Sequence, residues 1–127
     1  MEWHFDDNMP IYTQLVYQIK FAIVSGELSP GEKMAGVRDL AADAGVNPNT
    51  MQRALQQLER EGLVFTQRSS GRFITEDTAV IGEAKRTLAR QHIEQFMASM
   101  KKLGYTREEI IALLERGEEE DKNGSML

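Results

Sequence analysis

The feature that most limits the fold is a very short connection between two predicted helices, in the segment VRDLAADAGVNPNT. The first helix runs from about residue 37 to residue 44 and ends at Gly45, because glycine readily adopts the left-handed conformation found after helix ends. Asn47 and Pro48 are typical of an N-cap and of a first helical position, so they begin the next helix. Val46 and Asn47 alone separate the two helices. Such a connection predicts a helix-turn-helix.

The segments on either side predict a winged form of this motif, over residues 8–76. Upstream, a helix begins at Pro10 with Asn8 as a candidate cap, and it ends at Gly26. Its apolar residues recur at every fourth position, at Ile11, Leu15, Ile19 and Ile23. The helix that starts at Pro48 ends at Gly62 and has the apolar stripe Met51, Ala54, Leu55 and Leu58. Strand-like residues 63–66 and 72–75 then flank the turn Ser69-Ser70-Gly71 and predict a hairpin.

The rest of the chain predicts a helical dimerisation hairpin over residues 77–117 and an acidic flexible tail over residues 118–127. A long helix with an apolar face runs from about residue 78 to residue 103 and ends at Gly104. Thr106 and Glu109 have the spacing of a capping box and begin a last helix that ends near residue 116. Two helices alone cannot bury both apolar faces, so we expect a second copy of the chain to cover them. The predicted dimer interface comprises Leu88, Phe96, Met97, Met100, Leu103, Ile110 and Leu114.

The predicted fold class is therefore mainly α with a small β-hairpin, and the composition excludes several functions. The 127 residues include no cysteine, which excludes disulfides, thiolate metal sites and cysteine nucleophiles. His4 and His92 lack the spacing of metal ligands, and no catalytic triad order or phosphate loop is visible, so we predict no metal, no cofactor and no enzymatic activity. The chain has neither a long apolar run nor the charge order of a signal peptide, so we expect a cytoplasmic protein with no membrane partner.

Charge and polar side chains instead indicate binding to DNA. The net charge is −5, but the acidic residues gather toward both ends, whereas residues 33–75 hold six basic and four acidic side chains. Hydrogen-bonding side chains crowd the start of the helix that begins at Pro48, as in a recognition helix that enters the major groove. These residues are Asn47, Asn49, Thr50, Gln52 and Arg53. Arg68 and Arg72 flank the hairpin turn, where a wing commonly contacts phosphates.

Residues 10–75 resemble the winged-helix domain of GntR-family transcriptional regulators. The matching stretches are PIYTQLVYQIKFAIVSGELSPGEKM, VRDLAADAGVNPNTMQRALQQLEREGLV and RSSGRFITED. The short C-terminal part with two helices is similar to the YtrA subfamily, whose members are dimeric bacterial repressors often set beside ABC-transporter operons. The resemblance implies a homodimer that binds a palindromic operator in double-stranded DNA. DNA contacts then fall on Arg38, Asn47, Asn49, Thr50, Gln52, Arg53, Gly71 and Arg72.

The chain departs from the family pattern just before the second helix. Family members usually have Leu-Pro-Ser there, whereas this chain has Met34-Ala35-Gly36. Glycine is a slightly weaker helix cap than serine, so we expect the fold to persist. We also expect one contact to a DNA phosphate to be missing, and the residues do not explain why.

Two other functions stay open at this point. One is a winged-helix protein-interaction module without DNA binding, which the missing Pro-Ser and the acidic net charge favour. The other is a sensor whose small-molecule effector binds at the dimer interface, although the sequence does not identify such a molecule. The aromatic residues Trp3, Phe5 and Tyr12 are expected to pack the N-terminal arm onto the domain or the dimer, with a small-molecule cage as the alternative.

Overall fold

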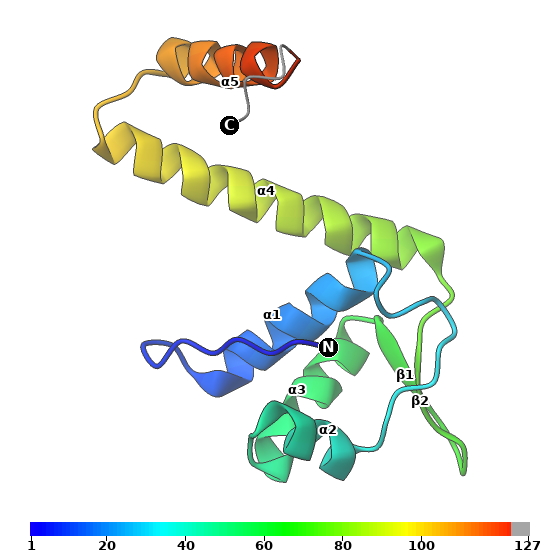
Figure 1. The fold of residues 1–127 in the computed structure, drawn as a ribbon. Coiled ribbons are helices and arrows are strands. Elements are labelled where there is room, and N and C mark those ends of the chain that lie inside the picture. The colour runs from blue at the N-terminus through cyan, green and yellow to red at the C-terminus, as the bar shows by residue number, and fades with distance from the viewer. Residues whose placement is uncertain (123–127) are drawn as a thin grey trace. The chain divides into compact units, whose positions relative to one another are not determined.

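The computed structural model describes the backbone of residues 1–122 and the side chains of residues 1–117. Figure 1 shows a mainly helical fold with one β-hairpin, which confirms the predicted fold class. The chain forms two compact units, Met1–Leu88 and Ala89–Leu127. The elements are α1 (Ile11–Val24), α2 (Val37–Ala44), α3 (Pro48–Arg60), β1 (Val64–Gln67), β2 (Gly71–Ile74), α4 (Thr78–Lys102) and α5 (Arg107–Lys122).

Helices α1 and α3 pack against each other and form the core of the first unit. Each helix contributes the apolar stripe that its residue spacing predicts. The side chains buried at this contact include Leu15, Ile19, Ile23, Met51, Leu55 and Leu58. Burying one side chain of this size stabilises the fold by roughly 1.5–3 kcal/mol. This packing therefore fixes the orientation of α3, whose opposite face carries the polar residues.

The tight connection between α2 and α3 has the predicted geometry. Gly45 follows α2 with φ of 72°, in the left-handed region, and its N–H donates to the carbonyl of Ala42 at 3.2 Å. Asn47 is the N-cap of α3, and its Oδ1 accepts the N–H of Asn49 at 2.8 Å. Pro48 occupies the first helical position, where no N–H donor is needed. The predicted helix-turn-helix is confirmed.

Each strand of the hairpin begins and ends one residue nearer the turn than the sequence predicts. β1 and β2 are antiparallel, and Gln67 pairs with Gly71 at the closed end. Gly71 therefore belongs to the strand and not to the turn, where Ser69 instead adopts the left-handed conformation with φ of 70°. A segment that the sequence did not predict lies along β2, because Lys33 and Phe73 form an antiparallel bridge. The N–H of Met34 donates to the carbonyl of Arg72 at 2.8 Å in this pairing.

The N-terminal arm, residues 1–9, is bound along α1 by two glutamine side chains. Gln18 accepts the N–H of His4 at 3.2 Å and donates to the carbonyl of the same residue at 2.6 Å. Gln14 likewise accepts the N–H of Asp6 and donates to its carbonyl. Asn8 makes no cap, which corrects that prediction: Pro10 is the N-cap of α1, without a side-chain hydrogen bond. Gln14 also donates to the carbonyl of Met9, just before the helix, which is a further bond to the arm and not a helix cap.

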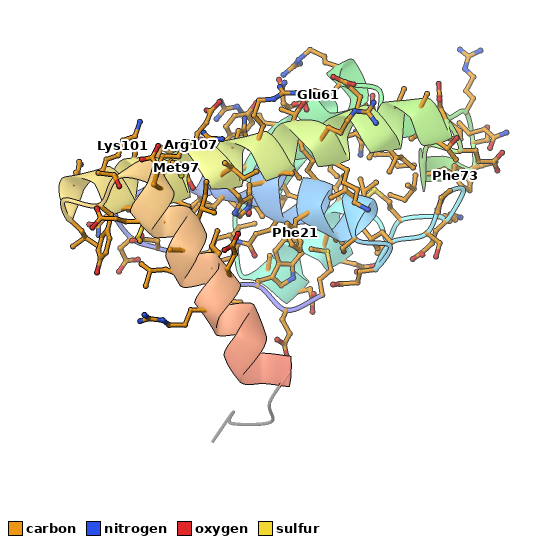
Figure 2. All side chains as sticks on the ribbon, turned by 90° about the horizontal axis from the view of Figure 1, so that it is seen from above. Phe21, Glu61, Phe73, Met97, Lys101 and Arg107 are labelled. Atoms are coloured by element: carbon orange, nitrogen blue, oxygen red, sulfur yellow. The ribbon has the colours of Figure 1, made fainter. Side chains whose placement is uncertain are left out.

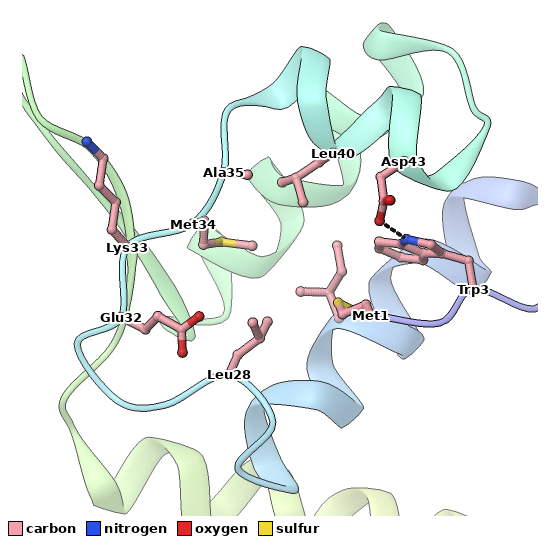
Figure 3. A pocket seen from close by; sticks show the side chains of 10 residues that line it. Met1, Trp3, Leu28, Glu32, Lys33, Met34, Ala35, Leu40 and Asp43 are labelled. Atoms are coloured by element: carbon pink, nitrogen blue, oxygen red, sulfur yellow. Dashed lines mark hydrogen bonds between the residues drawn. The ribbon is translucent and has the colours of Figure 1, made fainter.

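The tip of the arm reaches α2. The indole N–H of Trp3 donates to Oδ2 of Asp43 at 2.9 Å, and the two side chains border a small pocket of about 320 Å³ (Figure 3). Trp3, Phe5 and Tyr12 pack against the core of the first unit, so the expectation that they hold the arm on the domain is confirmed.

Both C-terminal helices begin with a cap, and the sequence predicts the one at the start of α5. Thr106 and Glu109 form the expected capping box: the N–H of Thr106 donates to Oε1 of Glu109 at 2.8 Å, and the N–H of Glu109 donates to the Thr106 hydroxyl at 3.2 Å. Asp77, which the sequence analysis did not single out, caps the start of α4 by accepting the N–H of Ala79 at 3.0 Å. α5 continues to Lys122, beyond the predicted end near residue 116. Residues 123–127 of the predicted tail lie outside the described residues.

The residues of the predicted dimer interface differ in burial. Leu88 and Ile110 are buried, and Met97 and Met100 are half-buried. Phe96, Leu103 and Leu114 have 42%, 72% and 58% of their surface exposed. In the described part of the chain, every helix is too short or too polar to cross a lipid bilayer.

Candidate nucleic-acid interface

The side chains predicted to contact DNA lie on α2, at the start of α3 and on the wing, which we define as residues 64–74. Arg38 of α2 is exposed, and so are Asn49 and Arg53 of α3. Thr50 and Gln52 are half-buried. Asn47 is exposed, but its side-chain oxygen already bonds the backbone of Asn49 as a cap. The start of α3 therefore presents amide, hydroxyl and guanidinium groups at the surface, which are the groups that can read base edges.

A groove of about 460 Å³ opens between the start of α2, the polar side of α3 and the wing. Three predicted contacts come together here from two elements, Gln52 from α3 and Gly71 and Arg72 from β2. The other residues that line it are Lys33, Met34, Ala35, Gly36, Val37, Thr66 and Ser70. The lining does not include Arg38, Asn47, Asn49, Thr50 or Arg53, so the structure brings one part of the predicted set together and leaves the rest outside the groove.

Lys33 is a candidate DNA contact that sequence reasoning missed. It was counted among the basic residues of the middle of the chain, but nothing placed it beside the wing. Its backbone bridge to Phe73 brings it to the groove, next to Gly71. Gly71 has φ of 112°, and a Cβ atom there would lie 3.3 Å from Cε of Lys33. Glycine at this position therefore avoids left-handed strain and leaves room for the lysine side chain.

The unusual Ala35-Gly36 pair also borders the groove. Gly36 is the N-cap of α2 and has no side chain with which to accept a hydrogen bond from the first turn. The free N–H groups at the start of a helix, together with the helix dipole, favour an anion. Where family members place a serine, the start of α2 thus presents backbone donors beside Lys33 and Arg72.

Arg72 is held by a side chain of α3. Its Nε donates to Oε1 of Glu59 at 2.8 Å, and the hydroxyl of Thr66 donates to the same oxygen. Burial by itself would raise the pKa of Glu59, but the hydrogen bonds from Thr66 and Arg72 and the charge of Arg72 outweigh it, so this pKa lies below its usual value. Glu59 is therefore ionised at neutral pH and links α3 to the wing.

Arg53 faces α1. Its guanidinium carbon lies 4.5 Å from the centre of the Tyr12 ring, in a cation–π arrangement. The sequence pattern predicts a DNA contact for Arg53, but the structure shows a packing role as well. Base contact by Arg53 stays a prediction.

A second ion pair fixes α1 to the end of α3, away from the lining of the groove. Nζ of Lys20 lies 2.5 Å from Oε1 of Glu61, which is labelled in Figure 2. Burial would raise the pKa of Glu61, but hydrogen bonds from Lys20 and Gln57 and the charges of Lys20 and Arg60 lower it overall. This pair is chemically similar to Arg72 and Glu59 and so provides a natural control for them.

The part of the chain that the structure describes contains no cluster of three or more His, Asp or Glu side chains able to hold a metal ion. The polar groups of the interface are amides, hydroxyls and cations, which suit hydrogen bonding to bases and phosphates.

Comparison with known proteins agrees with this geometry. Residues 11–74 match the model of the bacterial regulatory proteins of the gntR family. The transcriptional regulator YhcF of Bacillus subtilis is 42% identical over 111 residues, which cover 87% of this chain and 92% of that protein. The transcriptional repressor YtrA of the same bacterium is 34% identical over 104 residues, which cover 81% of this chain and 80% of YtrA.

A solved structure extends the likeness to both units. A GntR-family transcriptional regulator from Listeria monocytogenes matches with a TM-score of 0.81 and 41% identity, over 88% of this chain and 98% of that one. The family match covers α1 through the wing, which are the elements that form the groove. The chain therefore belongs to the gntR family of bacterial regulatory proteins and is a DNA-binding transcriptional regulator, not an enzyme.

Proposed function

We propose that this regulator is a YtrA-type repressor, which binds a palindromic operator as a homodimer and blocks transcription. The observation that carries the proposal is the groove in which Gln52 of the recognition helix meets Gly71 and Arg72 of the wing. The similarity of this chain to the repressor YtrA supports repression over activation. The subfamily resemblance makes an ABC-transporter operon the first candidate target.

In this proposal α3 enters the major groove and the wing lies on the DNA backbone. Asn49, Thr50, Gln52 and Arg53 would read base edges, because a helix presents its N-terminal side chains to the bases in this docking mode. Arg38, Arg72 and the backbone at Gly71 would contact phosphates, and these contacts set affinity more than sequence preference. Asn47 would contact DNA through its amide nitrogen, because its oxygen caps α3.

Dimerisation would occur through the predicted helical hairpin, residues 77–117. Phe96, Leu103 and Leu114 are large apolar side chains that the single chain leaves substantially exposed. A second copy would cover them, as is common for symmetric oligomers of soluble proteins. Two recognition helices related by a two-fold axis would then read half-sites about one DNA turn apart, roughly 34–36 Å, or a multiple of this distance.

Fluorescence anisotropy of the purified protein on DNA from the region upstream of its own gene tests the proposal. We expect tight binding to this DNA, weaker binding to scrambled DNA of the same composition, and a steep decrease in affinity with salt. Gln52→Ala should lower the preference for the upstream DNA, since a good side-chain-to-base contact contributes about 1–3 kcal/mol of discrimination. Gln56→Ala is the matched control, because Gln56 is an exposed glutamine of the same helix and is not among the residues that line the groove.

Equal, weak binding to both DNAs would contradict the proposed operator. A second experiment, transcription in vitro from the upstream region, shows whether the protein represses or activates. Repression predicts less transcript as the protein concentration rises. An increase in transcript would overturn the proposal that the protein is a repressor.

A further inference from the structure

The contact between Glu59 and Arg72 joins the element that would read bases to the element that would lie on the DNA backbone. Oε1 of Glu59 accepts hydrogen bonds from Nε of Arg72, at 2.8 Å, and from the hydroxyl of Thr66. The side chains are only partly exposed, 18% for Arg72 and 30% for Glu59. Such shielding favours a persistent ion pair over the transient pairs typical of open surfaces.

We propose that Glu59 is a positioning residue for DNA binding, which holds the guanidinium of Arg72 in the groove in an orientation that suits a backbone phosphate. This inference rests on the proposed function, because it takes Arg72 to be a phosphate contact. Glu59 itself would not touch the DNA.

The chemistry of the guanidinium supports this arrangement. The group is planar and carries its N–H donors on Nε and on the two terminal nitrogens. The bond to Glu59 uses Nε, and the terminal nitrogens are the donors with which Arg72 can bind a phosphate. A long arginine side chain loses rotational freedom when it binds. Glu59 restricts Arg72 before the DNA arrives, and Thr66 fixes the carboxylate in turn.

The carboxylate could also act in the opposite way. As an anion near the phosphates it repels DNA, and it could compete with them for Arg72. These two effects have opposite signs, so the change in affinity on removing Glu59 decides between them.

The experiment compares Glu59→Ala, Arg72→Ala and the double variant with the wild type, by fluorescence anisotropy on the upstream DNA over a series of salt concentrations. Positioning predicts that Glu59→Ala lowers affinity about three- to tenfold and reduces the slope of log K against log salt by about 1.8, because the homodimer loses one phosphate contact of about 0.9 in each of its two subunits. Arg72→Ala should give the same reduction in slope. The double variant should bind no more weakly than Arg72→Ala, because Glu59 acts through Arg72.

Two further variants separate position from charge. Glu59→Gln retains an oxygen that accepts the Nε–H of Arg72, so we expect it to keep the wild-type slope although it loses the negative charge. Glu61→Ala removes the same charge from the residue that follows α3, but the partner of Glu61 is Lys20 of α1, so this variant too should keep the wild-type slope. Circular dichroism at the assay temperature verifies that each variant is folded. If Glu59→Ala does not fold, Thr66→Val is used in its place. This variant removes the hydrogen bond from Thr66 to Glu59, and we expect a smaller loss of affinity in the same direction.

Tighter binding by Glu59→Ala would overturn the proposal and show that the carboxylate competes with DNA. Additive losses in the double variant would also overturn it. A wild-type slope for Arg72→Ala, with binding to the upstream DNA still specific, would remove the positioning role and leave the proposed function intact. No preference of the wild type for the upstream DNA would instead contradict the proposed function itself.

Discussion

At the scale of single residues, Asn47 combines a structural role with a proposed role in binding. Its Oδ1 accepts the N–H of Asn49 and caps the recognition helix. We expect Asn47→Ala to lower the free energy of unfolding by about 1 kcal/mol, and Asn47→Asp to leave it close to wild type, because aspartate caps as well as asparagine. Urea denaturation measures both values. Equal stability of Asn47→Ala and the wild type would show that the cap is not needed.

DNA binding by the same two variants separates the roles. An aspartate adds a negative charge where the DNA backbone approaches, so Asn47→Asp should weaken binding while the helix cap is retained. Unchanged affinity in Asn47→Asp would place residue 47 away from the DNA.

Glu61 predicts a pH dependence of stability. Burial raises the pKa of Glu61, but the hydrogen bonds from Lys20 and Gln57 and the charges of Lys20 and Arg60 outweigh it, so the pKa is lowered in the folded protein. A carboxyl group with a depressed folded-state pKa stabilises the fold above its unfolded pKa, about 4.3 for glutamate, and loses this contribution as the pH falls. We therefore expect the melting temperature to decrease below about pH 5, and to decrease less steeply in Glu61→Gln.

Thermal denaturation followed by circular dichroism between pH 7 and the acid limit checks this expectation. Glu59 has a pKa shifted in the same direction, so Glu61→Gln should remove only part of the dependence. Parallel curves for Glu61→Gln and the wild type would rule out Glu61 as a source of acid sensitivity.

At the scale of elements, the N-terminal arm depends on two glutamines of α1 that bond its backbone much as a neighbouring strand would. Trp3 is the single tryptophan of the chain and lies at the tip of the arm, so its fluorescence reports on the arm alone. We expect Gln14→Ala with Gln18→Ala to release the arm, which shifts the Trp3 emission to longer wavelength and increases quenching by acrylamide. Gln56→Ala changes an exposed glutamine of α3 and is the control. Unchanged emission in the double variant would contradict the clamp.

The parts of the fold that local patterns determine could be predicted from the sequence. The glycine after α2, the cap and proline before α3, and the capping box of α5 all act within a few residues, and the structure has them where expected. Each strand lies one residue nearer the turn than predicted, because Gly71, which was assigned to the turn, pairs with Gln67, and Ser69 takes the left-handed conformation of the turn. The cap at Asn8 was wrong because Pro10 lies at the N-cap position of α1, two residues after Asn8, and has no side chain that accepts a hydrogen bond.

The site was harder to predict because it depends on contacts between elements. Polar residues clustered at the start of α3 pointed to a recognition helix. No pattern, however, indicates that Lys33 pairs with the wing, that Arg53 stacks on Tyr12, or that Glu59 binds Arg72. Each of these contacts joins residues from separate elements. A sequence can show that such side chains are present, but the packing of α1, α3 and the wing decides which of them meet.

At the scale of the whole molecule, the proposed function depends on dimerisation, because one winged helix contacts too few bases to select an operator. We expect Phe96→Asp with Met100→Asp to produce a monomer in sedimentation velocity, since two charges on an apolar interface would be buried without partners. The monomer should bind the palindromic operator much more weakly than the wild type, while the first unit, which contains neither residue, remains folded.

A charge-matched variant tests whether this effect belongs to the apolar face. Gln91→Asp with Gln95→Asp adds the same number of acidic residues to α4, at exposed positions outside the predicted interface. It should remain a dimer and keep its affinity for the operator, because these side chains can stay in water. A folded dimer of Phe96→Asp with Met100→Asp would show that the chains associate elsewhere. If that double variant is monomeric and still binds a whole operator as tightly as the wild type, the two-fold model of recognition is wrong.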